Sequence, residues 1–193
     1  SYLNICLLIS RAIRRMHAAG LSHSDLSYKN ILIDQVSVKA CIIDNDGLVV
    51  PGKFPPDVVG TPDFIAPEVM QTLKLKVSDP AKKIPKRETD MHALAVLIYM
   101  YLLCRHPLRG KKIYDIDDEN RDEELAMGEK ALFVESDKDT TNRYDIKWVK
   151  NNIPANRYPY IAPWMDIDKR PYTILGPYLS QFVRQAFQDG LHN

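Results

Sequence analysis

Cysteine is scarce in this sequence, and its spacing offers no framework for cross-linking. Only three cysteines occur, far apart and without a CxxC pair: Cys6, Cys41 and Cys104. A disulfide-stabilised secreted domain normally has a dense, even set, so that class is not indicated. Each cysteine lies in an apolar run, and the sequence therefore predicts buried, reduced thiols and a cytoplasmic location.

An excess of one charge sign is also absent. The chain carries 26 Lys and Arg side chains against 25 Asp and Glu side chains, which leaves a formal net charge of +1. Because this balance creates no broad basic field, nucleic acid is not expected as a partner.

No apolar run is long enough for a membrane span. The longest is "MHALAVLIYMYLLC" at residues 91–104, whereas a spanning helix needs roughly 20 apolar residues. This run predicts a helix buried on all sides within a globular domain. Residues 1–17 show helical periodicity and hold three arginines in their second half, unlike a signal peptide. No membrane partner is expected.

The chain does contain enough apolar residues for one folded domain, since 45% of its 193 residues are hydrophobic. Helical spacing extends over residues 1–19, with Gly20 as its stop. Two β-branched segments, 30–34 and 37–44, predict short strands. Residues 45–63 hold four Pro and three Gly and predict a loop. The buried side of the first helix is expected to carry Leu3, Cys6, Leu7, Ile13 and Met16.

Helical signals dominate the rest of the chain. Pro67 lies near the start of a short helix, and Thr89 and Asp90 are expected to cap the buried helix at its N-terminus. An acidic block at residues 115–124 leads into a predicted helix over 124–135.

A connection rich in proline and aromatic residues follows at about 142–173. Its aromatic cluster predicts a packed irregular segment, with a docking surface as the alternative: Tyr158, Tyr160, Trp164 and Tyr172. The segment 175–193 predicts an amphipathic helix with one apolar face: Leu179, Phe182, Val183, Ala186 and Phe187. The whole pattern is that of a mainly α fold with a short β element near residue 35.

A short polar segment, "HSDLSYKN" at residues 23–30, interrupts the hydrophobic pattern. Taken alone, Asp25 and Asn30 fit ordinary turn residues. However, a helix precedes them, Asn30 opens one predicted strand, and a second strand ends at Asp44. This order would bring two carboxylates and an amide together. Phosphoryl transfer needs such groups to accept a hydroxyl proton and to hold Mg²⁺.

These segments resemble the motifs of protein kinases. "HSDLSYKN" (23–30) is similar to the catalytic loop H-R-D-L-x-x-x-x-N, with the same Asp-to-Asn spacing. "CIIDNDG" resembles the strand leading to the D-F-G metal site, and "GTPDFIAPE" (60–68) resembles the end of an activation segment. "ETDMHALAVLIYMYLLCRHPLRG" (88–110) is similar to the buried helix of the large lobe. Four motifs in the kinase order, spanning residues 1 to about 110, imply a kinase-like C-terminal lobe over residues 1–193.

The later part of the chain resembles one branch of the family. "GEKALFVESDKDTTNR" (128–143) and "PYTILGPYLSQFVRQAFQDGLHN" (171–193) are similar to eukaryotic-type kinases encoded in bacterial stress and tellurite-resistance gene clusters. A bacterial Ser/Thr kinase is therefore expected.

The resemblance implies a role for each candidate residue. Asp25 would be the catalytic base, and Asn30 and Asp44 would hold Mg²⁺ bridging the phosphates of ATP. Asp46 is the alternative metal ligand, because "DNDG" offers two carboxylates; the motif position favours Asp44. Four further residues would support the site structurally: His23, Thr61, Glu68 and Asp90.

Several positions depart from the family pattern. Ser24 stands where many kinases have the Arg that receives an activation-loop phosphate. Residues 47–60 contain no Ser, Thr or Tyr, so an activation segment held by its prolines, without phosphorylation, is expected: Pro51, Pro55 and Pro56. Ser27 replaces a Lys that helps to hold the γ-phosphate, and Lys29 is expected to supply that charge instead. Asn45 replaces the Phe of D-F-G.

Other kinase motifs are absent. The chain has no G-x-G-x-x-G loop and no V-A-I-K strand, and no helix supplying the partner Glu precedes Ser1. The resemblance therefore implies that an N-terminal lobe in a longer parent protein covers the nucleotide and that this fragment alone is inactive. It also implies an Arg partner for Glu68 beyond residue 193.

These observations lead to an expected function and two alternatives. The expected activity is ATP- and Mg²⁺-dependent phosphoryl transfer to Ser or Thr of a protein substrate, because "GTPDFIAPE" resembles the Ser/Thr-type segment. A pseudokinase that acts as a scaffold is favoured by Ser24, Ser27 and Asn45. A small-molecule kinase is disfavoured by the A-P-E segment. The sequence does not identify the substrate.

Overall fold

The computed structural model describes residues 1–51, 53, 60–154, 156–157 and 164–191. The chain divides into two compact units. The first unit comprises Ser1–Ile98 with Met127–Glu129, and the second comprises Tyr99–Ala126 with Lys130–Asn193.

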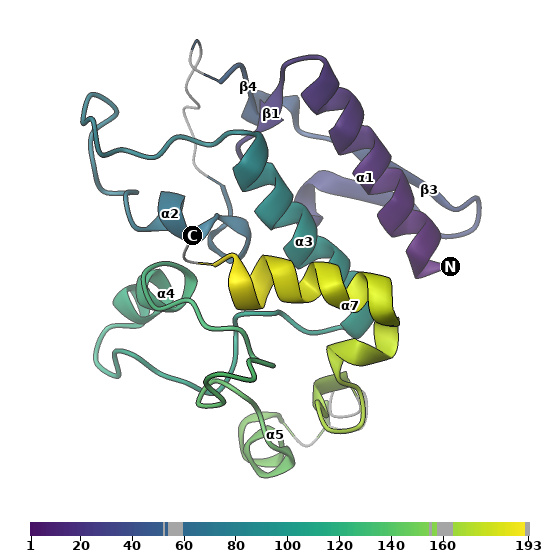
Figure 1. Cartoon of the computed structure of the whole chain (residues 1–193), viewed down its shortest axis with the longest axis vertical. Coiled ribbons are helices and arrows are strands. Elements are labelled where there is room, and N and C mark those ends of the chain that lie inside the picture. The colour runs from purple at the N-terminus through teal and green to yellow at the C-terminus, as the bar shows by residue number, and fades with distance from the viewer. Residues whose placement is uncertain (52, 54–59, 155, 158–163, 192–193) are drawn as a thin grey trace. The chain divides into compact units, whose positions relative to one another are not determined.

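Helices dominate the described part of the chain (Figure 1). They are α1 (Tyr2–Ala18), α2 (Pro67–Met70), α3 (Arg87–Leu103), α4 (Glu119–Met127), α5 (Ile146–Asn152) and α7 (Pro177–Arg184). The strands form two antiparallel pairs: β1 (Ser22–His23) with β4 (Leu48–Val49), and β2 (Ile31–Asp34) with β3 (Lys39–Ile42). The prediction of a helix-rich fold with a short β element is confirmed.

Helix α1 buries a different stripe from the one expected. Its buried residues are Ile5, Cys6, Ile9 and Ile13, whereas Leu3 and Leu7 are 53% and 56% exposed. The prediction was wrong for these two leucines because the first half of the helix is apolar at almost every position. In such a segment the spacing does not single out one face.

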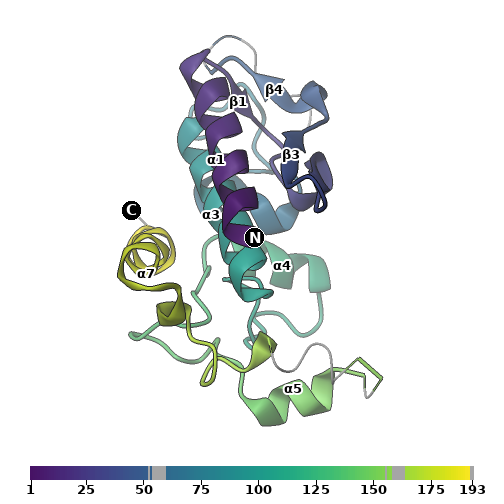
Figure 2. The same cartoon turned by 90° about the vertical axis from the view of Figure 1, so that its right-hand side faces the viewer.

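The end of α1 is as predicted. Gly20 adopts a positive φ of +84°, which a glycine accommodates without strain. The N–H groups of Gly20 and Leu21 donate to the carbonyls of His17 and Met16, which is the Schellman pattern at a helix C-terminus. This turn leads the chain directly into β1. Figure 2 shows α1 alongside α3 in the first unit.

The two strand pairs differ in how visible they are in the sequence. β2 and β3 form a hairpin in which Leu32 pairs with Cys41 and Asp34 with Lys39. Both strands lie within their predicted segments. The β1–β4 pair joins Ser22 to Val49 and His23 to Leu48. It was missed because two-residue strands have no readable alternation.

Helices α2 and α3 follow the loop. Pro67 is the first residue of α2, as predicted. The expected caps of α3 were misplaced, because the helix begins at Arg87 and Thr89 and Asp90 lie inside its first turn. Thr89 Oγ1 accepts a hydrogen bond from the Lys86 N–H at 2.9 Å, the side-chain half of a capping box. From Thr89 to the end of α3 the residues are buried or half-buried, with Met91 as the exposed exception in that stretch.

The second unit contains two corrections to the helix predictions. Helix α4 begins inside the acidic block and ends at Met127, so the stretch after Gly128 is not helical. Helix α5 interrupts the connection that was expected to be irregular. It is capped by Asp145, whose side chain accepts from the Trp148 N–H at 2.8 Å. The hydrogen bond from the Trp148 N–H lowers the pKa of Asp145. Tyr158 and Tyr160 lie outside the described residues.

The C-terminal helix is also only partly as expected. α7 ends at Arg184 and continues as one wide turn of π-helix over Gln185–Asp189. Val183 and Phe187 are buried as predicted, but Phe182 is 64% exposed. Phe182 lies in the regular part of the helix, before the π-turn, and the buried residues Val183 and Phe187 are four positions apart, so the buried stripe is narrower than the predicted face.

The cysteine prediction is correct for one residue. Cys6 is buried, and burial raises the pKa of its thiol to about 11. Cys41 and Cys104 are exposed, so the expectation of three buried thiols was wrong. Among the described helices, none has the length and apolar content needed to cross a membrane.

Candidate active site

Asp25 and Asn30 are brought together by a tight loop between β1 and β2. The loop closes with one turn of 3₁₀ helix at Tyr28–Asn30, in which the Asn30 N–H donates to the Ser27 carbonyl. Asn30 Nδ2 donates to the Asp25 backbone oxygen at 2.8 Å and to Asp25 Oδ2 at 3.0 Å. Asn30 is buried and Asp25 is half-buried. The loop therefore fixes the carboxylate while leaving it accessible.

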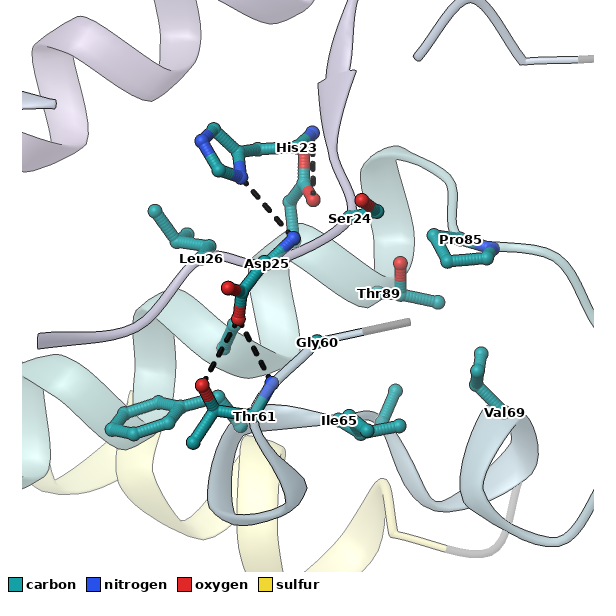
Figure 3. Close-up of a pocket in the computed structure, with 14 residues that line it drawn as sticks. His23, Ser24, Asp25, Leu26, Gly60, Thr61, Ile65, Val69, Pro85 and Thr89 are labelled. Carbon is teal, nitrogen blue, oxygen red and sulfur yellow. Dashed lines mark hydrogen bonds between the residues drawn. The ribbon is translucent and has the colours of Figure 1, made fainter. Parts of the chain in front are cut away.

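A segment distant in the sequence holds the other oxygen of the same carboxylate. Asp25 Oδ1 accepts from the Thr61 N–H at 2.8 Å and from Thr61 Oγ1 at 3.1 Å (Figure 3). Nearby, the Tyr28 and Phe64 rings meet edge to face with centroids 5.7 Å apart. The "GTPDF" segment is thus packed against the catalytic-type loop.

Gly60 allows this approach. Its φ is +39°, and a Cβ at this position would lie 2.9 Å from the Ser24 carbonyl oxygen. A larger residue would both strain the backbone and push the loop away from Asp25. Half of the segment expected to be held by prolines (residues 47–60), including Pro55 and Pro56, lies outside the described residues.

Asp44 follows β3, and β3 is paired with the strand that begins after Asn30. The Ile43 N–H donates to the Asn30 carbonyl at 2.9 Å, so the register places Asp44 one residue beyond a direct contact with Asn30. Asp44 is exposed and has a φ of +63°. A non-glycine residue in the left-handed region is uncommon and concentrates at functional sites. Asp46 is exposed within the next turn, Asn45–Gly47.

The donor atoms in this area suit a hard divalent cation. Asn30 uses its NH₂ group for both hydrogen bonds to Asp25, which turns its amide oxygen away as an acceptor. Asp44 adds an exposed carboxylate. Oxygen ligands of this kind match Mg²⁺. Within the described residues, no group of three or more His, Cys, Asp or Glu side chains is arranged to hold a metal ion.

His23 and Asp90 form the support beneath the loop. The His23 N–H donates to both carboxylate oxygens of Asp90, at 2.9 and 3.1 Å. His23 Nδ1 accepts from the Asp25 N–H at 3.2 Å. His17, at the end of α1, places Nε2 2.7 Å from Asp90 Oδ2. Asp90 thus joins α1, β1 and α3 at one point. Sequence analysis missed His17, since nothing marks a helix-terminal histidine as a partner of a residue 73 positions away.

Ser24 is hydrogen-bonded to the turn that follows Asp44. Its N–H and its hydroxyl both donate to the Gly47 carbonyl, at 2.7 and 3.0 Å. A Cβ on Gly47 would lie 3.0 Å from the His23 ring. Ser24 therefore ties the segment after Asp44 to the loop that carries Asp25.

The remaining candidates lie on the surface or in the core. Lys29 is exposed in the turn beside Asn30, and Glu68 is exposed on α2. Ser27 is fully buried, and its hydroxyl has no hydrogen-bond partner among the described residues. Ser27 therefore presents no group to a phosphate at the surface, whereas Lys29 can.

A small cavity lies against this site. Its volume is about 20 Å³, which is enough for roughly one water molecule. Asp25 and Thr61 line it together with Pro85 and Thr89 (Figure 3). The cavity is too small for a nucleotide. It does show that the end of the loop before α3, at Pro85, borders the same cavity as Asp25.

Removing the Asp90 carboxylate is expected to destabilise the first unit. Asp90 is 1% exposed, and Asp90→Ala would leave the His23 N–H buried without an acceptor. We expect a loss of about 3 kcal/mol in the free energy of unfolding, measured by urea titration. Asp90→Asn keeps one acceptor oxygen and should lose less than half as much. Equal losses for the two variants would show that packing, not hydrogen bonding, is the main contribution.

The stability difference between the wild type and Asp90→Asn is expected to depend on pH. Burial raises the pKa of Asp90, although hydrogen bonds from His17 and His23 oppose the shift. Because the folded-state pKa lies above the unfolded value, Asp90 contributes stability that is present below about pH 4 and is lost as pH rises through the raised pKa. The stability difference between the wild type and Asp90→Asn should therefore shrink over that interval. A difference that grows with pH would contradict this.

Comparison with known proteins agrees with the geometry. The family model described as "Protein kinase domain" matches residues 2–183. The death-associated protein kinase dapk-1 of Caenorhabditis elegans is 31% identical over 130 residues, covering 66% of this chain and 8% of that protein. The serine/threonine-protein kinase PknD of Chlamydia pneumoniae is 31% identical over 132 residues, covering 58% of this chain and 13% of that protein.

Among solved structures, the kinase PK-1 of Cydia pomonella granulovirus aligns with a TM-score of 0.49 and 16% identity. The alignment covers 94% of this chain and 55% of that chain. The chain spans only about a tenth of the length of the two curated relatives above. Since the family model covers nearly the whole sequence, the chain belongs to the protein kinase domain family.

Proposed function

We propose that this chain is the large, C-terminal lobe of a protein serine/threonine kinase. Within a longer parent protein, it would transfer a phosphoryl group from ATP to a Ser or Thr hydroxyl of a protein substrate. The observation that carries the proposal is the fixed Asp25 carboxylate, hydrogen-bonded to both Asn30 and Thr61. The serine/threonine-protein kinase PknD among its relatives supports the reaction class.

Asp25 would act as the catalytic base. The hydrogen bonds from Thr61 and Asn30 fix the orientation of the carboxylate. A substrate hydroxyl brought to Asp25 would be aligned by it and would lose its proton to it. Most of the rate enhancement would come from positioning, with proton transfer adding to it.

The residues present fit Mg²⁺ and ATP. Asn30 and Asp44 would hold the metal through an amide oxygen and a carboxylate, and the bound metal would neutralise charge on the phosphates. The left-handed backbone at Asp44 supports it over Asp46 as the ligand. Lys29, exposed in the turn beside Asn30, would add positive charge close to the phosphates. Leu32 and Cys41 are exposed cross-strand partners, and their shared apolar face is suited to a planar base.

A scaffold function is the second candidate. Ser24 bonds to a backbone carbonyl and carries no charge, and the Ser27 hydroxyl is buried. Two cationic positions of the family are therefore neutral here. A pseudokinase would retain the fold and bind partners without transferring phosphate.

The test is transfer of labelled phosphate from ATP by the full-length parent protein in the presence of Mg²⁺. Label on Ser or Thr of the protein or an added substrate, lost in Asp44→Asn, would support the kinase. Absence of transfer, together with absence of Mg²⁺-dependent ATP binding, would favour the scaffold.

A further inference from the structure

The loop that joins α2 to α3 concentrates positive charge. Residues 71–86, here termed the lysine loop, contain five lysines and a single acidic residue, Asp79, although the whole chain has a net charge of only +1. Asp79 is occupied within the loop, where its side chain accepts from the Ala81 N–H at 2.8 Å. The loop therefore presents an excess of positive charge that the composition of the chain conceals.

The lysine loop is held in a defined shape. Lys82 Nζ donates to the carbonyls of Thr72 and Leu73 at 2.8 and 2.7 Å. The Lys83 N–H donates to Thr72 Oγ1 at 3.0 Å. These bonds join the two ends of the loop and use the charge of Lys82 to satisfy carbonyls at the end of α2. Compact surface loops closed in this way are frequently functional.

Three of the other lysines are exposed, namely Lys76, Lys83 and Lys86. Lys86 lies 3.7 Å from Glu88, with both side chains more than half exposed, and such a pair contributes little. Apolar side chains are exposed between the lysines, namely Leu75, Val77 and Ile84. The loop thus combines cations with apolar contact points, which matches a peptide that alternates acidic and apolar residues.

The lysine loop is also adjacent to the proposed catalytic base. Pro85, near its end, lines the same cavity as Asp25. Thr89 also lines this cavity. Its hydroxyl accepts from the Lys86 N–H at 2.9 Å and donates to the Lys86 carbonyl at 2.7 Å, which fixes the backbone of Lys86. A peptide whose hydroxyl lies at Asp25 extends about 3.3 Å per residue. Residues two to four positions from the acceptor would therefore lie about 7–13 Å from Asp25, a reach that lets a peptide extend past Pro85 onto the lysine loop.

An acidic side chain on the neighbouring helix limits where the attraction acts. Glu68 is exposed on α2, which precedes the lysine loop in the sequence. A peptide crossing that helix would meet negative charge, whereas one crossing the loop would meet Lys76 and Lys83. The charge pattern therefore favours acidic residues on only one side of the acceptor.

We propose that the lysine loop selects protein substrates in which the acceptor Ser or Thr is flanked on one side by acidic residues. This inference rests on the proposed kinase function and names the substrate class for the same site. Lys76, Lys83 and Lys86 would pair with the acidic residues, and Leu75, Val77 and Ile84 would contact apolar residues between them. Recognition of this kind sets specificity and is sensitive to salt.

The test compares three peptides of equal length with one Ser: acidic residues before it, acidic residues after it, or neutral residues throughout. We expect one acidic peptide to exceed the neutral peptide in kcat/KM by about tenfold at low ionic strength. The ratio of kcat/KM for the acidic peptide to kcat/KM for the neutral peptide should fall towards one in the double variant Lys76→Glu/Lys83→Glu, and also in the wild type at high salt. The matched control is Lys147→Glu/Lys150→Glu, which makes the same charge change at exposed positions of α5 and should retain the preference.

The outcomes separate this inference from the proposed function. Equal transfer to all three peptides would overturn the inference and leave the kinase function standing. Absence of transfer to any peptide would count against the function, and direct binding of a fluorescent acidic peptide without ATP would then still decide the inference. Binding of anionic vesicles that depends on Lys76 and Lys83, without discrimination among peptides, would assign the loop to a lipid surface and overturn it.

Discussion

Asp25→Asn in the full-length parent protein is expected to reduce phosphoryl transfer by about a thousandfold, the range typical for loss of a positioned general base. The Asn side chain retains an oxygen that can accept from the Thr61 N–H, now 2.8 Å from Asp25 Oδ1. Its NH₂ group cannot take a proton from a substrate hydroxyl. Transfer should be measured under saturating ATP, and binding of ATP with Mg²⁺ should remain near the wild-type value.

A swapped pair provides the structural control for this variant. Asp25→Asn places one NH₂ group against another, because Asn30 Nδ2 now donates to Asp25 Oδ2 at 3.0 Å. Adding Asn30→Asp restores a donor–acceptor pair with the carboxylate at the other position. The double variant should recover part of the stability to urea but not activity, because a carboxylate at position 30 cannot donate to the backbone oxygen of residue 25 as the Asn30 amide does. Recovery of activity, or a wild-type rate in the single variant, would show that Asp25 is not the base.

The loop that carries Asp25 could be anticipated from the sequence because its geometry is local. Five residues separate Asp25 from Asn30, and a single 3₁₀ turn closes the distance. The register of the β2–β3 hairpin, also local, brings Asp44 near Asn30. Short-range hydrogen bonds of this kind depend on residue type and spacing, both of which are readable in one sequence.

Contacts between distant segments were not readable in the same way. The pairing of β1 with β4 and the bond between His17 and Asp90 depend on tertiary packing. Thr61 was proposed for the site only through resemblance to the kinase motif. Its bonds to Asp25, across 36 residues, have no signal in periodicity or composition.

The helix predictions failed where the segment contained either too many or too few apolar residues to define one buried face. In α1 an excess of apolar residues obscured the buried stripe. In α5 the opposite holds, because Val149 is the only buried residue within its described span. The Asp145 cap was the available signal, and a cap without periodicity does not define a helix.

The largest effect on stability is expected in the second unit, where a buried ion pair joins Arg105 to Glu135. Arg105 Nη2 lies 2.6 Å from Glu135 Oε1, and the two side chains are 1% and 2% exposed. Arg105 also donates to the carbonyls of Trp164 and Arg170 at 2.9 and 2.6 Å. Glu135 Oε2 accepts from the Tyr172 N–H at 2.8 Å. The pair therefore holds three backbone groups between residues 164 and 172.

Tyr99, on α3, completes the cluster. Its hydroxyl donates to Glu135 and accepts from Arg105 Nε at 3.1 Å. Burial, reinforced by the Glu135 charge, raises the pKa of Tyr99 well above its usual range. The phenol stays protonated and able to donate. Glu135 Oε1 thus accepts hydrogen bonds from both Tyr99 and Arg105. A buried ion pair is tolerated when its remaining lone pairs are satisfied in this way.

Glu135→Ala is expected to lower the free energy of unfolding by about 3–5 kcal/mol, because it leaves Arg105 charged, buried and without its counterion. Urea unfolding at neutral pH would measure the loss. The double variant Arg105→Met/Glu135→Leu removes both charges and should recover part of it. Recovery should be incomplete, since the Trp164 and Arg170 carbonyls and the Tyr172 N–H lose their partners. A loss below about 1 kcal/mol in Glu135→Ala would show that the pair is dispensable.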